Sequence, residues 1–195
     1  MIRVATALVS VVIAAPASAH FVAASGPWAK LHRPLHMPAV APGAPCPVSG
    51  VGRANFAKYG VGKGIGPGPA YPIGFEQPGS VLHFAYPPDP ATEFAGSVWS
   101  GQKVLWFVFP SYRGPLLIRG RRLDAPDVLR FERGKVPSTE MRIPAVGRGG
   151  YPQGQGQRDR ASYTRLRAPG CYAYQIDGTS FSRVIVFTAA TYPGP

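Results

Sequence analysis

Proline and glycine limit the fold more than any other feature, because they exclude helix from the N-terminal part of the chain and bound the apolar runs that follow. The 195 residues include 23 prolines and 24 glycines. Proline fixes φ and has no N–H to donate, so a proline-rich segment stays extended. The prolines concerned are Pro34, Pro38, Pro42, Pro45 and Pro47. Residues 20–77, rich in Pro, Gly and Ala, are therefore predicted to form a non-helical arm with loops.

Four short runs after this arm have the composition of strands. They are rich in β-branched and aromatic residues and end at Pro, Gly or Asp. They cover residues 81–86, 104–109, 116–119 and 128–132. The second run has no polar alternation, which predicts a central strand covered on both faces. A turn over residues 124–127 would join the last two runs as a hairpin.

The C-terminal part predicts a closing hairpin. Strands over residues 171–177 and 181–188 flank a turn at Gly178. Alternation puts Tyr172, Tyr174 and Ile176 on one face, which we expect to be the buried one. Cys171 then lies on the opposite, outer face together with Ala173, Gln175 and Asp177.

Short strands with turn signals and almost no helical periodicity predict an all-β fold. We expect an immunoglobulin-like sandwich with a Pro/Gly-rich N-terminal arm, with a small β-barrel as the alternative. The sandwich core would cover residues 78–195, and the arm and core would form one domain.

The first 19 residues have the pattern of a secretory signal peptide. Arg3 gives the positive start, residues 4–15 form the apolar segment, and Ala17, Ser18 and Ala19 are the small residues before cleavage. A membrane anchor is the alternative, but the apolar run is shorter than the roughly 20 residues that cross a bilayer. Cleavage after Ala19 makes His20 the first mature residue, and the protein is expected to be secreted or extracytoplasmic and associated with the cell envelope.

The charge balance favours anionic partners. Loss of Arg3 with the signal peptide lowers the excess of basic over acidic residues from 12 to 11. Outside the cytoplasm such partners are anionic cell-wall polymers, acidic polysaccharides or the membrane surface, and nucleic acid is not expected. A basic surface that serves only solubility is the alternative.

The two cysteines agree with export. Cys46 and Cys171 lie far apart in the chain, and neither belongs to a metal-binding or redox motif. They are predicted to form one structural disulfide. Because Cys171 is expected on the outer face of its strand, the bond should fasten the arm to the outside of the sandwich and leave the two sheets unlinked.

Several segments carry a resemblance. Residues 44–49 (APCPVS), 66–72 (GPGPAYP), 112–124 (YRGPLLIRGRRLD) and 169–187 (PGCYAYQIDGTSFSRVIVF) resemble parts of uncharacterised small exported bacterial proteins of actinobacterial type. The last segment is also similar to the final strands of extracellular immunoglobulin-like domains. The resemblance implies export and a β-sandwich, and it carries over no functional residue.

No motif in the sequence predicts a catalytic site. The chain has neither a G-x-S-x-G elbow nor an H-E-x-x-H pair. The acidic residues are explained by turns and solvated strand edges. A glycosidase with two carboxylates stays open as an alternative, because two strands can bring such a pair together.

The histidines predict a metal site as the alternative function. A mature N-terminal His20 could bind copper through its amine and imidazole, in the manner of a histidine brace. The remaining ligand would come from His32, His36 or His83.

Arginines concentrate around the predicted hairpin and suggest a site for anions. They are Arg113, Arg119, Arg121, Arg122, Arg130 and Arg133. Guanidinium groups pair bidentately with phosphate and carboxylate, so one exposed basic face would hold anionic polymer. The solvated face of an amphipathic hairpin is the simpler interpretation. The sequence thus predicts a non-catalytic envelope protein with a structural or ligand-binding role.

Overall fold

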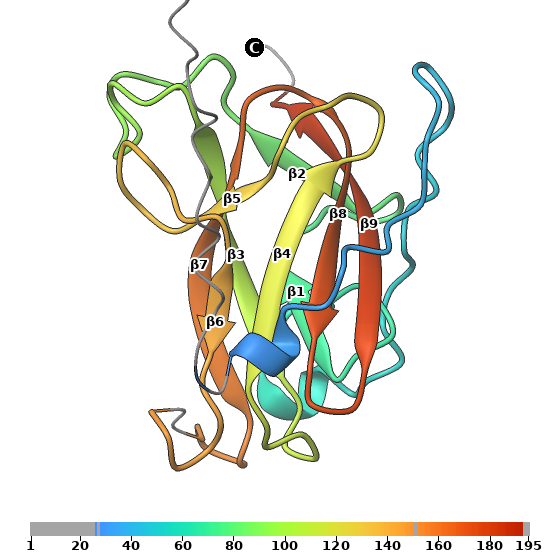
Figure 1. Cartoon of the computed structure of the whole chain (residues 1–195), viewed down its shortest axis with the longest axis vertical. Helices are drawn as coiled ribbons and strands as arrows, with labels where there is room; N and C mark the ends of the chain where they lie inside the picture. The colour runs from blue at the N-terminus through green and yellow to red at the C-terminus, as the bar shows by residue number, and fades with distance from the viewer. Residues whose placement is uncertain (1–25, 27, 150–151, 193–195) are drawn as a thin grey trace, which may run out of the picture.

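Nine strands form two sheets in the computed structural model, which describes residues 26, 28–149 and 152–192 (Figure 1). One sheet has the strand order β1-β3-β7-β5, and the other has the order β2-β9-β8-β4-β6. The strands are β1 (Ala70–Ile73), β2 (Val81–Phe84), β3 (Ser100–Val108), β4 (Leu116–Arg122), β5 (Arg130–Phe131), β6 (Met141–Ile143), β7 (Arg158–Leu166), β8 (Gly170–Asp177) and β9 (Ser182–Thr191). The helical elements of the described residues are two 3₁₀ turns, η1 (Ala29–Leu31) and η2 (Ala57–Tyr59).

The predicted all-β sandwich is confirmed. The orders β1-β3-β7-β5 and β9-β8-β4 follow the A-B-E-D and G-F-C orders of immunoglobulin-like sandwiches. The edge strand β2 pairs in parallel with β9, whereas the other pairs are antiparallel. Strand β6 is additional to that pattern, because the chain returns after β5 to the other sheet and pairs there with β4.

The core lies between the two inner faces. Trp106 of β3 meets Tyr174 of β8 edge to face, with ring centroids 5.0 Å apart. Tyr172 and Ile176 lie in the same core, which confirms the predicted buried face of the closing hairpin. The Tyr174 hydroxyl bonds the Thr164 hydroxyl at 2.5 Å, and burial raises the pKa of Tyr174 far above its ordinary value. The alternation of side chains along β8 therefore directs Tyr172, Tyr174 and Ile176 into the core between the two sheets.

The opposite face of β8 is also buried, which the sequence did not predict. Cys171, Ala173, Gln175 and Asp177 are at most 4% exposed. The first part of the arm, residues 33–49, lies across them. Met37 and Val40 pack on the small apolar group formed by Leu123, Cys171, Ala173 and Val186. Local alternation predicts that this face is exposed to solvent. The prediction fails because the segment that covers the face lies more than 100 residues away in the sequence.

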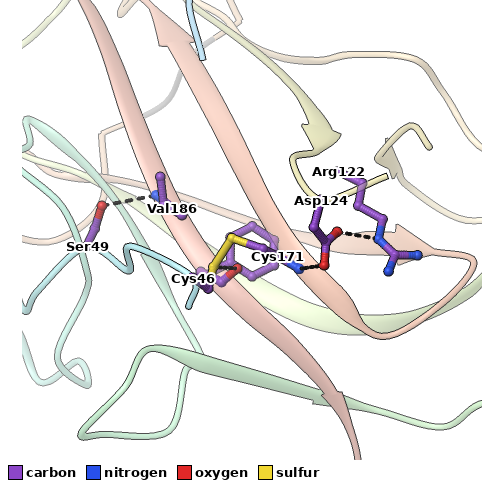
Figure 2. Close-up of a disulfide and its surroundings, with 7 residues drawn as sticks. Cys46, Ser49, Arg122, Asp124, Cys171 and Val186 are labelled. Carbon is purple, nitrogen blue, oxygen red and sulfur yellow. Dashed lines mark hydrogen bonds and ion pairs between the residues drawn. A yellow bond between two sulfur atoms is a disulfide. The ribbon is translucent and has the colours of Figure 1, made fainter. Parts of the chain in front are cut away.

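The disulfide joins that arm to the outer face of the sandwich. Cys46 and Cys171 are bonded, with Cα atoms 5.4 Å apart (Figure 2). Ser49 exchanges two hydrogen bonds with the backbone of Val186, through its N–H (2.8 Å) and its Oγ (3.0 Å). The Asp124 carboxylate accepts the Cys171 N–H at 3.1 Å. As predicted, the bond fastens the arm and does not link the two sheets.

The second part of the arm covers the other sheet. Phe56 packs edge to face on Tyr71 of β1 and Phe107 of β3, at centroid distances of 5.1 and 6.2 Å. The ring centroids of Tyr59 and Phe107 are 5.1 Å apart. Other segments therefore pack on both faces of β3, which confirms the expectation from its unbroken apolar run.

Two local expectations were wrong or incomplete. The predicted hairpin across residues 119–133 forms only next to its turn, where Arg121 and Val128 make an antiparallel bridge, and it does not extend further because β4 and β5 belong to different sheets. The turn itself exists, since the Arg122 N–H donates to the Asp127 carbonyl at 3.0 Å. Strands β1, β6 and β7 were missed. Strand β7 buries Arg158, Ser162, Thr164 and Arg165, and such polar residues do not give a strand pattern.

Candidate functional site

The histidines do not assemble a metal site in the part of the chain that the structure describes, where no group of three potential ligands occurs. His83 uses both ring nitrogens, with Glu76 at 2.8 Å and the Thr191 carbonyl at 3.2 Å. The ring of His32 lies 3.1 Å from Glu140, and His36 is exposed with its backbone N–H on Gln175. His20, the centre of the predicted brace, lies outside the described residues.

The six predicted arginines do not form one face. Arg113 lies in the loop between β3 and β4, whereas Arg119, Arg121 and Arg122 lie on β4 of the five-stranded sheet. Arg130 lies on β5 and Arg133 follows it, on the four-stranded sheet. The expected grouping depended on the β4–β5 hairpin, and it is lost because the chain crosses between the sheets.

Two arginines of the five-stranded sheet have structural partners. Arg119 donates to the fully buried Asp177 at 2.8 Å, and Arg33 of the arm approaches the same carboxylate at 3.5 Å. Arg122 donates to Asp124 at 2.6 Å. These pairs hold the arm and the turn in place, so Arg119 and Arg122 are not free to bind a ligand.

The predicted residues Arg130 and Arg133 belong to a different group, here named the arginine–aromatic cluster. Its members come from β5, β7 and the loops 85–99, 132–138 and 167–169. They are Phe94, Trp99, Tyr163, Arg130, Arg133, Arg165 and Arg167. The guanidinium carbons of Arg130 and Arg167 lie 5.6 and 4.3 Å from the centre of the Trp99 ring. The guanidinium of Arg133 lies 5.6 Å from the Tyr163 ring, and Phe94 packs edge to face on Tyr163 at 5.3 Å.

Arg165 organises this end from inside. Its side chain is fully buried, and its guanidinium lies 4.1 Å from the Phe94 ring centre. It donates to the carbonyls of Trp99 (2.6 Å), Gly134 (2.9 Å), Ser100 (3.1 Å) and Glu132 (3.1 Å). Burial lowers the pKa of Arg165, but an arginine keeps its charge under all ordinary conditions. The buried cation therefore fixes both loops to the end of the sheet.

A pocket of about 460 Å³ lies beside the cluster, on the outer face of the four-stranded sheet. It is lined by Lys103, Glu132, Arg133, Ala161, Ser162 and Tyr163. Lys103 is exposed and Arg133 pairs with Glu93 at 3.1 Å. A hydrogen bond with the Glu93 carboxylate raises the pKa of Tyr163, and this bond uses the single proton of the phenol. Glu132 forms an ion pair with Arg160 at 2.7 Å.

Four basic side chains at this end make no ion pair with any acidic residue of the described ranges. They are Lys103, Arg130, Lys135 and Arg167. Stacking on an aromatic ring leaves the guanidinium edge and its N–H donors available. Such a group can hold phosphate or carboxylate oxygens by charge-assisted hydrogen bonds. The predicted site included Arg130 and Arg133 but missed Trp99, Lys135 and Arg167, because these residues meet only through the crossing of the chain between sheets.

The acidic residues considered for catalysis have structural partners instead. Asp124, Glu132, Glu140 and Asp177 each pair with an arginine. Asp127 accepts the N–H of Val128 at 3.0 Å, as expected for a turn residue. These carboxylates stabilise turns, strand ends and the arm.

Comparison of the chain with protein-family models, curated proteins and solved structures gave no match. Among the described residues, no helix has the length and apolar character needed to cross a membrane.

Proposed function

We propose that this chain is an exported, non-catalytic β-sandwich protein that binds an anionic polymer or surface of the cell envelope. The observation that carries the proposal is the position of Arg130 and Arg167 on the ring of Trp99, with Lys103 and Lys135 at the same end of the sheet and no ion pair to any of the four among the described residues. The signal-type residues 1–19 and the Cys46–Cys171 disulfide support an extracytoplasmic location, since disulfides persist in oxidising compartments.

The site is suited to binding because its cations are held before the ligand arrives. Arg165 fixes the two loops, and Trp99, itself 6% exposed, orients two guanidinium groups. A preorganised site loses little side-chain entropy on binding. The net charge of the whole chain, +12, adds long-range attraction to an anionic partner.

Binding of the mature protein to anionic envelope material tests the proposal. The probes are poly(glycerol phosphate) on beads and vesicles that contain phosphatidylglycerol. The test variant is the triple Lys103→Glu, Lys135→Glu, Arg167→Glu. The matched control is Arg53→Glu, Arg113→Glu, Arg148→Glu, which changes the net charge equally at exposed arginines elsewhere. Thermal unfolding checks that both variants are folded.

The test triple should weaken binding by about 100-fold or more, since each basic residue near an anionic surface contributes about 1 kcal/mol. Added salt should weaken wild-type binding, because exposed charges are screened over about 8 Å at physiological ionic strength. Equal losses in both triples would show that only net charge matters, and the proposed site would then be wrong.

A further inference from the structure

Two loop tips at the arginine–aromatic cluster carry aliphatic side chains into solvent. Val136 is 90% exposed and Val98 is 65% exposed, more than the other exposed large hydrophobic residues among the described residues. Val98 is the last residue but one of the loop 85–99 and Val136 lies in the loop 132–138, and Figure 1 shows both loops side by side. Exposed aliphatic groups contribute nothing to the folded core, whereas a partner that covers both valines would gain the free energy of their burial.

The two tips form one unit. The Ser97 hydroxyl donates to the Lys135 carbonyl at 2.8 Å, and the valines are the next residue of each loop. The buried Arg165 side chain bonds Ser97 as well as the backbone of both loops. The pair of valines is thus presented on a fixed support and needs no ordering on binding.

Basic groups belong to these two loops or contact them. Lys135 precedes Val136, and Arg130 and Arg167 stack on Trp99, the residue that follows Val98. A soluble anionic polymer could use the cations but has no apolar region to cover the valines. An anionic bilayer offers both, because lipid phosphates lie directly above the acyl chains.

We propose that this end docks on an anionic membrane, with Val98 and Val136 inserted between the lipid headgroups and Lys135, Arg130 and Arg167 on the lipid phosphates. The inference rests on the proposed function and selects its partner: the membrane surface and not the wall polymer. The charge of the site provides attraction to the bilayer, and the two valines anchor the protein to it.

Vesicle sedimentation with the mature chain tests the insertion. The vesicles contain equal parts of phosphatidylglycerol and phosphatidylcholine, with pure phosphatidylcholine and soluble poly(glycerol phosphate) as comparisons. The variant Val98→Ser, Val136→Ser should bind the anionic vesicles about tenfold more weakly, the factor expected when two partly buried aliphatic groups are lost. The control Val51→Ser, Val128→Ser alters valines that are each 42% exposed and should stay within twofold of wild type.

A second readout reports depth directly. In Val136→Trp, the emission of the added tryptophan should shift to the blue on anionic vesicles and should not shift with soluble poly(glycerol phosphate). The inference is overturned if the valine variant keeps full vesicle affinity or loses affinity equally for vesicles and polymer. If the Lys103, Lys135 and Arg167 triple still weakens binding in that case, the proposed function survives. If the wild type binds neither probe, both fail.

Discussion

Removal of the disulfide should separate the stability of the arm from that of the closing hairpin. The perturbation is Cys46→Ala, Cys171→Ala, which leaves no free thiol. The two cysteines are 125 residues apart. In the chain-entropy model, a cross-link over that distance stabilises the native state by about 5 kcal/mol, because it restricts the unfolded chain. Urea unfolding should show a loss approaching that value.

The structure also predicts where the chain opens first. The arm depends on Cys46, on the contacts of Ser49 with Val186 and on the polar contacts of residues 33–36, whereas Tyr174 lies in the core between the sheets. Without the disulfide, the segment before about residue 60 should open locally while the sandwich stays folded.

Hydrogen exchange of the two forms measures this difference. The Ser49 amide, bonded to the Val186 carbonyl at 2.8 Å, reports on the arm. The paired residues Tyr174 and Ile185 report on the hairpin. The Ser49 amide should approach the exchange rate of an unprotected chain. The hairpin amides should stay protected and exchange only through global unfolding. If the hairpin opens as readily as the arm in the variant, the assignment of the bond to the arm is refuted.

Substitutions at three charged residues provide further tests. Asp177→Asn should lower the free energy of unfolding by about 3 kcal/mol in urea, because it leaves Arg119 without its buried partner. Arg165→Met should cost a similar amount, about 3 kcal/mol, and expose the flanking loops to exchange; Arg165→Lys should not restore them, since lysine lacks the planar fork. For Asp124, burial opposes ionisation, but the bonds from Arg122 and the Cys171 N–H lower the pKa overall. Its stabilisation is therefore present above about pH 4 and lost on further acidification, so melting curves of wild type and Asp124→Asn should converge below that pH.

Local sequence patterns determined the fold class and the inner face of the closing hairpin. Proline and glycine excluded long helices, and period-two alternation placed Tyr172, Tyr174 and Ile176 toward the core. The pairing of Cys46 with Cys171 followed because no other cysteine exists. Each of these conclusions needed only neighbouring residues or a count.

The tertiary structure alone decided what covers each sheet and which basic residues meet. The outer face of β8 is buried because the arm crosses it, and the expected arginine hairpin is split because the chain passes from β4 to the other sheet. Strand β7 contributes buried Arg165, whose donors are satisfied by four carbonyls and the Ser97 hydroxyl, 31 to 68 residues away in the chain. Local alternation reports which side chains share a face, whereas cover and long-range hydrogen bonds depend on how distant segments pack, and that information exists only in the folded chain.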